Sequence, residues 1–239
     1  GTYSINGTIE DGQVIVNAGD EDKVYLILDG ANITCSNSAP IYVKNAKKAI
    51  LALNSDSENT ITDSQTYELE DASSNEPNAA IFSKDDMTII GDGKLTVNAN
   101  YNNGISSNDD LKIQSGNIIV NAKNNGIKGK DSLNISAGNI TVNSEGDGLK
   151  ADNTSDTTKG YIYIEGGKIN ITSGEDGIQA ETDLLIADGD ITIKTGGGSA
   201  NSSKSNKVPG QKPNNMMQGE RPEIPSGDFQ GGEPPQMPS

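Results

Sequence analysis

Acidic side chains recur at matching positions in the second half of the chain. Asp147 and Asp176 each precede a glycine in the related segments GDGLKADN and EDGIQAET, and Asp152 and Glu181 share a second position there. If these segments stack as neighbouring strands, equivalent residues lie about 4.8 Å apart. Two carboxylates at that distance repel each other unless a cation bridges them or one is protonated. Calcium binds oxygen at about 2.3 to 2.6 Å, so one ion fits between them.

The sequence therefore predicts calcium as a cofactor held by acidic residues of stacked turns. A second ladder of acids follows from the same alignment, further upstream. The candidate metal ligands are Asp147, Asp152, Glu175, Asp176, Glu181, Asp85, Asp109 and Asp131. An alternative stays open, because Asp and Asn also favour turns, where their side chains accept hydrogen bonds from the local backbone.

Basic and aromatic side chains close to these acids could contact a sugar polymer. Lysine ammonium groups beside calcium could pair with the carboxylates of a uronic acid polymer, although lysine can equally separate like charges on a solvated face. Tyrosine rings could stack against sugar rings, but aromatic residues make up 4% of the chain and Trp is absent, so polar contacts should dominate. The candidate ligand-binding residues are Lys128, Lys130, Lys150, Tyr101, Tyr161 and Tyr163.

The composition excludes several function classes. With 34 acidic and 18 basic residues the net charge is −16, which disfavours nucleic acid and anionic membranes as partners. The absence of His removes the usual general base and the commonest zinc or copper ligand. Cys35 is the single cysteine, so no internal disulfide forms. We find no apolar run that predicts membrane insertion, and a start at Gly1 suggests a processed or trimmed chain.

An internal repeat of about 22 residues must position these side chains. NNGISSNDDLKIQSGNIIVNA is followed by NNGIKGKDSLNISAGNITVNS, and Gly104, Gly126 and Gly148 recur at intervals of 22. The next glycine, Gly177, follows after 29 residues because seven are inserted. Each unit holds three short pieces in which apolar and polar residues alternate, as expected for strands.

This pattern predicts an all-β protein, a right-handed parallel β-helix with three strands per coil. Stacking the coils gives three inward ladders, which are Ile105, Ile127, Leu149 and Ile178; Ile113, Ile135, Ile164 and Ile186; and Val120, Val142, Ile171 and Ile193. We assign residues 1–199 to the β-helix, with irregular early coils that partly cap it. Residues 200–239 are rich in Pro, Gly, Ser and Asn and form a tail or a long loop.

The segments GDGLKADN and GYIYIEGGKINITSGEDGIQAETDLLIADGDITIKTGGGS resemble the calcium-binding, carbohydrate-binding β-helix proteins of anaerobic cellulose-degrading bacteria. The resemblance is best over residues 78–199, and its most specific feature is the recurring motif Asp-Gly-Ile/Leu-x-Ala. It implies a pectate-lyase-like fold, export to the cell surface, calcium on the coils, and affinity for cellulose and acidic plant sugars without cleavage. Members of the family often carry a Gly/Pro/Met-rich stretch, as this chain does, and it is sometimes followed by further coils that this sequence does not show.

We therefore expect a secreted or cell-surface, monomeric, non-catalytic protein that binds plant cell-wall polysaccharide such as cellulose or polygalacturonate-type polymers. The competing hypothesis is that the protein is a calcium-dependent pectate lyase. Such an enzyme needs a base to remove the C5 proton of the uronate. No Arg occurs in residues 1–199, so Lys128 or Lys150 would have to act, and neighbouring carboxylates keep lysine protonated. A glycosidase is weaker still, because ladder pairs alone show no cleft between two carboxyl groups. A structural or adhesion module is the third reading.

Overall fold

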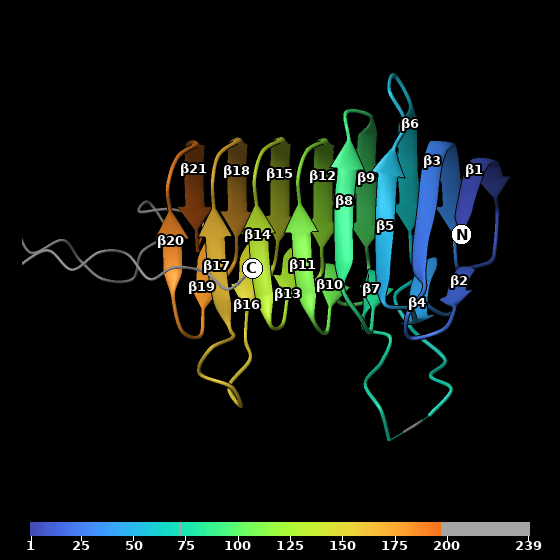
Figure 1. Cartoon of the computed structure of the whole chain (residues 1–239), viewed down its shortest axis with the longest axis horizontal. Coiled ribbons are helices and arrows are strands. Elements are labelled where there is room, and N and C mark those ends of the chain that lie inside the picture. The colour runs from blue at the N-terminus through green and yellow to red at the C-terminus, as the bar shows by residue number, and fades with distance from the viewer. Residues whose placement is uncertain (72, 197–239) are drawn as a thin grey trace, which may run out of the picture. The chain divides into compact units, whose positions relative to one another are not determined.

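The computed structural model describes residues 1–71 and 73–196, which form a parallel β-helix without α-helices among those residues. In Figure 1 the chain rises through the front strands, crosses to the back strands, descends and returns along the bottom while it advances from right to left, which is a right-handed path. The predicted fold is confirmed. No helix in the described part is long and apolar enough to span a membrane. The predicted tail at 200–239 lies outside the described residues.

The coils present three faces, which we name front, back and lower after their places in Figure 1. The front face consists of β3 (Lys23–Thr34), β5 (Lys48–Leu53), β8 (Met87–Gly91), β11 (Asp110–Ile113), β14 (Ser132–Ile135), β17 (Tyr161–Ile164) and β20 (Leu184–Ile186). The back face consists of β6 (Glu58–Thr62), β9 (Lys94–Ala99), β12 (Asn117–Ala122), β15 (Asn139–Ser144), β18 (Lys168–Ser173) and β21 (Asp190–Thr195). The lower face consists of β2 (Val14–Asn17), β4 (Ile41–Asn45), β7 (Ala79–Ser83), β10 (Asn103–Ser107), β13 (Ile127–Gly129), β16 (Leu149–Ala151) and β19 (Ile178–Ala180).

Strand β3 joins two of these faces into one sheet. Its first half pairs with β5 and its second half with β6, so the front and back strands, together with β1, form a continuous 14-stranded sheet. Strand β1 (Thr2–Ile9) pairs with β3 at the N-terminal end. The lower strands form a separate seven-stranded sheet.

The core follows from period-two alternation within each strand. Along β15, Ile140 and Val142 are buried while Asn139 and Asn143 face outward. The three predicted inward ladders are confirmed by the strand registers, which pair each apolar residue with its equivalent in the next coil. In the last described coil Ile186 and Ile193 are 45% and 44% exposed, because no described strand covers them.

Glycine is required where the lower face turns inward. A Cβ on Gly126 would lie 2.7 Å from the carbonyl oxygen of Gly148 and would overlap the Val142 side chain. The regular glycine spacing seen in the sequence therefore marks a point where each coil packs closely against its neighbour and against its own core. This packing keeps the coils in register, so outward side chains also align.

Candidate functional site

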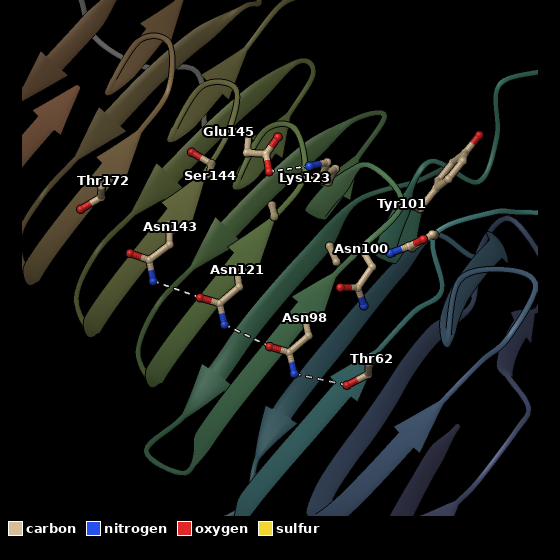
Figure 2. Close-up of a pocket in the computed structure, with 13 residues that line it drawn as sticks. Thr62, Asn98, Asn100, Tyr101, Asn121, Lys123, Asn143, Ser144, Glu145 and Thr172 are labelled. Carbon is tan, nitrogen blue, oxygen red and sulfur yellow. Dashed lines mark hydrogen bonds and ion pairs between the residues drawn. The ribbon is translucent and has the colours of Figure 1, made fainter. Parts of the chain in front are cut away.

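A groove of about 930 Å³ runs along the outer surface of the back face. Its floor carries Asn98 on β9, Asn121 on β12 and Asn143 on β15, which are paired in register. Figure 2 shows these amides in a line across successive coils. Because they face outward from consecutive strands, they are spaced by the strand separation of about 4.8 Å.

The three amides are linked by hydrogen bonds into a ladder. The Nδ2 of Asn143 donates to the Oδ1 of Asn121 over 3.0 Å, and the Nδ2 of Asn121 donates to the Oδ1 of Asn98 over 3.0 Å. Asn98 in turn donates to the hydroxyl of Thr62 over 3.3 Å. Each amide offers two N–H donors and an oxygen with two lone pairs. The ladder uses one donor of each, and one lone pair each of Asn98 and Asn121, so hydrogen-bonding capacity remains at every coil.

One end of the groove carries an aromatic ring. Tyr101 stacks on Tyr67 with ring centroids 4.0 Å apart and planes tilted by 14°. Buried Asp63 fixes this pair, since it accepts hydrogen bonds from the Tyr67 hydroxyl over 2.6 Å and from the Asn100 backbone N–H. Burial, followed by the charge of Asp63, raises the pKa of Tyr67 far above its ordinary value, so Tyr67 remains a donor. Burial also raises the pKa of Asp63, and these hydrogen bonds oppose that rise.

The groove carries almost no net charge. Among its described lining residues, Lys123 and Glu145 are the charged ones, and they pair with each other over 2.6 Å. Figure 2 shows this pair beside the amide ladder. The site thus combines repeated neutral hydrogen-bonding groups with one aromatic ring, which suits a polymer rich in hydroxyl groups better than a charged one.

The acids predicted as calcium ligands lie at the turns around the lower face, and Asp147 belongs to a ladder of turn hydrogen bonds. In this ladder each side-chain Oδ1 accepts the backbone N–H of the equivalent residue in the next coil. Asn103 accepts from Asn125, Asn125 accepts from Asp147 over 3.0 Å, and Asp147 accepts from Asp176 over 2.9 Å. The second oxygen of Asp147 accepts the Lys150 ammonium over 2.6 Å. Both oxygens of this buried carboxylate therefore already have protein partners.

Other predicted acids on this face also contact lysine or solvent. Asp152 pairs with Lys128 of the preceding coil over 2.7 Å, so Lys128 and Lys150, two of the three lysines predicted to bind sugar, are ion-paired with acids. The remaining predicted side chains here, namely Glu175, Asp176, Glu181 and Lys130, are exposed.

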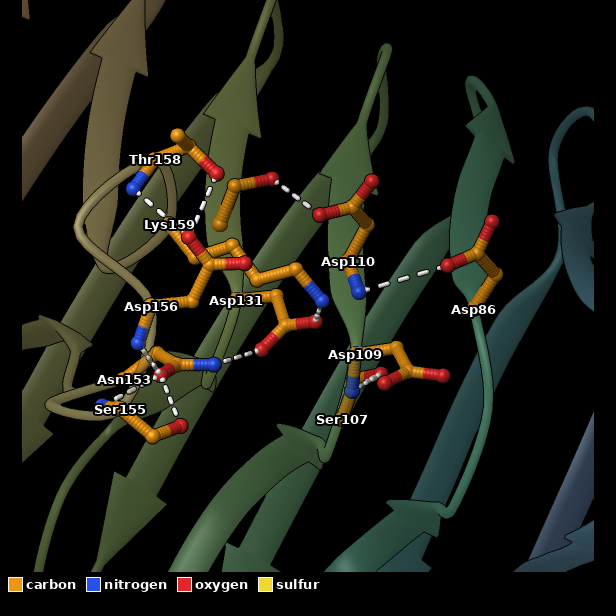
Figure 3. A network of polar contacts seen from close by, with 11 residues as sticks. Asp86, Ser107, Asp109, Asp110, Asp131, Asn153, Ser155, Asp156, Thr158 and Lys159 are labelled. Carbon is orange, nitrogen blue, oxygen red and sulfur yellow. Dashed lines mark hydrogen bonds and ion pairs between the residues drawn. The ribbon is translucent and has the colours of Figure 1, made fainter.

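The second predicted acidic ladder gathers around Asp131 (Figure 3). Lys159, from the inserted loop, pairs with Asp131 over 2.5 Å, and the Asn153 amide donates to its other oxygen. Burial, then the charge of Asp131, raises the pKa of Asp109. Asp85 accepts the Ala46 backbone N–H over 2.9 Å.

These contacts test whether calcium fits the acids as they stand. Within residues 1–71 and 73–196, no group of three or more metal-ligating side chains comes close enough to hold one ion. The oxygens that a cation would need are taken at Asp147 by Lys150 and a backbone N–H, and at Asp131 by Lys159 and the Asn153 side-chain amide. The arrangement therefore does not fit a calcium site built from these side chains, and calcium stays a prediction.

Comparison with known proteins identifies the family. A family model described as carbohydrate-binding domain-containing protein matches residues 1–226. A carbohydrate-binding domain-containing protein of Acetivibrio thermocellus is 54% identical over 197 residues, which are 82% of this chain and 69% of that protein. The chain belongs to this carbohydrate-binding domain family. A solved structure of the polysaccharide lyase-like protein from C. thermocellum, a gadolinium derivative, matches with a TM-score of 0.73 and 44% identity over 81% of this chain and 82% of that one.

The groove of this carbohydrate-binding domain contains one of the ligand-binding residues that the sequence predicts, Tyr101. Tyr161 and Tyr163 lie on β17 of the front face, outside the groove. The amide ladder and the Asp63 and Tyr67 support were missed. The ladder had a signal, because Asn98, Asn121 and Asn143 each follow a buried valine at the same position of the repeat.

Proposed function

We propose that this carbohydrate-binding domain holds a neutral plant cell-wall polysaccharide, of the cellulose type, along the groove of the back face without cleaving it. The observation that carries the proposal is the amide ladder, in which Asn98, Asn121 and Asn143 repeat at the coil spacing along the length of the groove. A polymer of sugars presents hydroxyl groups at regular intervals, and a row of regularly spaced amides can meet several of them at once. We propose that the protein acts outside the cell, as a secreted or surface-attached monomer.

The geometry suggests how recognition would be divided. The amides bind hydroxyl groups through the donors and lone pairs that the ladder leaves unused. Tyr101, held rigid by its stack on Tyr67, offers a ring for the apolar face of one sugar. Since Lys123 and Glu145 neutralise each other, binding should depend little on salt.

Non-catalytic binding is the second part of the proposal, and it is supported by the scarcity of groups that could act as a general acid or base. The chain has no His, and Lys128 and Lys150, which would serve as the base of a lyase, are ion-paired with acids. Incubation with polygalacturonate and calcium should yield no unsaturated product absorbing in the ultraviolet. Steady growth of that absorbance would assign the protein to the lyases instead.

Calcium and acidic polymers remain a second candidate function, favoured by the clustering of Asp85, Asp86, Asp109 and Asp131. Burial, followed by the repulsion of neighbouring acids, raises the pKa of Asp86 and of Asp109. A calcium ion that bridged a uronic acid polymer to these carboxylates would relieve that repulsion. Binding of polygalacturonate that requires calcium and disappears with chelator would support this function.

Affinity electrophoresis and cellulose pull-down test the groove directly. Tyr101→Ala removes the stacking ring and should weaken binding by about threefold to tenfold, because such contacts contribute about 0.5 to 1.5 kcal/mol. Asn121→Ala removes the central amide and should cost about 1 kcal/mol. The matched controls are Tyr163→Ala and Asn134→Ala, which remove the same side chains from outward positions on the front face.

The controls decide the outcome. Wild-type affinity in both control variants, with loss in both groove variants, supports the proposal. Equal loss of affinity in Tyr163→Ala and Tyr101→Ala would mean either that the sugar binds on the front face or that both variants are destabilised. Thermal melting followed by circular dichroism distinguishes these two explanations.

A further inference from the structure

A pocket of about 240 Å³ lies on the front face, on β3, β5 and β8. Tyr25, which is 40% exposed, lines it together with Ile50 and the two lysines Lys23 and Lys48. The lysines are paired in register on adjacent strands. The pocket therefore joins an apolar surface to two ammonium groups, and it lies on a different face from the amide groove.

The lysines of this pocket differ from most others in the described chain. Eight described lysines pair with acids. Lys23 and Lys48 have no such partner within residues 1–71 and 73–196, and neither has Lys112, which lies beside the pocket residue Thr88 in the strand register. Asp86 is the acid whose pKa Lys48 and Lys112 lower, against the stronger effect of its burial. Lys48 and Lys112 thus share one half-buried acid, and Lys23 has no acidic partner in the described part, although the protein has a net charge of −16.

Thr88 supplies a second and independent observation. Its side chain faces the pocket and is 5% exposed, yet its hydroxyl has no hydrogen-bond partner among the described atoms. Buried hydroxyl groups are nearly always satisfied, so an orphan at a pocket points to a partner that comes from outside the chain. This oxygen is covered in the structure, so a ligand would reach it only after a rim side chain shifted, as flexible lysine stems allow.

We propose that this front-face pocket binds a sugar-sized ring that carries an anionic substituent, as a site separate from the polysaccharide groove. Lys23 and Lys48 pair with the anionic group. The ring lies against Tyr25 and Ile50, and one of its hydroxyl groups hydrogen-bonds to Thr88. The pocket volume suits one residue of an acidic saccharide, so the protein would recognise charged and neutral sugars on opposite faces.

Titration of the full chain with glucuronate at low salt, followed by NMR, tests the proposal. Signals of β3, β5 and β8 should shift and saturate, while those of β12 and β15 should not. Lys23→Gln and Lys48→Gln should each weaken binding by about tenfold, as expected for a hydrogen bond to a charged group. Thr88→Val keeps the shape and removes the hydroxyl, and it should weaken binding by about threefold to tenfold.

Glucose, acetate and Lys168→Gln are the controls. Lys168 begins β18 on the back face and has no acidic partner in the described part, so removing its charge should leave glucuronate affinity unchanged. Saturation by glucose at the same concentration, no saturable shift with glucuronate, or equal loss in Lys168→Gln would each overturn the proposal. Tighter binding of acetate than of glucuronate would also overturn it, since the ring would then contribute nothing. Cellulose pull-down of Lys23→Gln and Lys48→Gln should match wild type, so this site can fail while the groove stands.

Discussion

Replacing Lys150 with Met is the most informative change in the acidic turns, because it separates an ion pair from a calcium site. The variant keeps most of the side-chain stem and removes the ammonium group that pairs with Asp147 over 2.6 Å. Asp147 would remain buried with an uncompensated charge, while its other oxygen still accepts the Asp176 N–H. The structure therefore predicts a clear loss of stability.

The size of the loss follows from the burial of the pair. Removing one partner of a fully buried pair costs about 3 to 5 kcal/mol. The Asp147 side chain is 4% exposed but that of Lys150 is 22% exposed, so water already screens part of the interaction. We expect about 2 to 3 kcal/mol, which corresponds to a fall in Tm of roughly 5 to 10 °C for a domain of this size.

A double variant provides the control. Asp147→Asn with Lys150→Met removes both charges and recreates the arrangement at Asn125, whose Nδ2 donates to Asn103 Oδ1 over 3.0 Å while its oxygen accepts the next backbone N–H. Its Tm should return to within a few degrees of wild type. The assay is thermal melting followed by circular dichroism, in chelator and in millimolar calcium.

Comparing Tm in chelator with Tm in calcium distinguishes an ion pair at Asp147 from a calcium site. If Asp147 serves the ion pair, Lys150→Met lowers Tm equally in both buffers. If Asp147 instead binds calcium, removing the competing lysine strengthens the site, and calcium at about 100 times Kd adds about 2.7 kcal/mol. A Lys150→Met protein that melts above wild type in calcium would refute our reasoning, and a wild type that melts lower in chelator would support calcium elsewhere on the coils.

Two further predictions concern stability. The pKa values of Asp86 and Asp109 are raised in the folded state, so the stability that they contribute is full below the ordinary Asp value of 3.8 and is lost as pH rises through the raised values. Asp109→Asn should therefore raise Tm at pH 7 by a few degrees and flatten the dependence of Tm on pH between 7 and 4; a lower Tm at pH 7 would contradict this. Gly126→Ala forces a methyl group against the Gly148 carbonyl oxygen and should cost about 1 to 3 kcal/mol, measured by denaturant unfolding, whereas Gly166→Ala, where the added methyl has more room, should cost less.

The amino-acid sequence by itself determined the coil. The alternation around Ile127, Leu133 and Val142 and the glycine spacing leave one way to bury every apolar side chain, which is to stack equivalent strands. Register then follows, since a slip by one residue would turn the apolar ladder outward. The register of the repeat also aligns the amide ladder, because Asn121 and Asn143 recur as regularly as the valines before them.

The tertiary structure decided which charges meet and where a ligand could lie. Lys150 pairs within its own turn, whereas Lys128 reaches Asp152 in the next coil, and no repeat spacing distinguishes these choices. Long, flexible side chains select partners by local geometry and burial, which the repeat pattern does not specify. The Tyr67 and Tyr101 stack is decided in the same way, because residue 67 belongs to an irregular segment outside the repeat and the repeat pattern does not specify its partner.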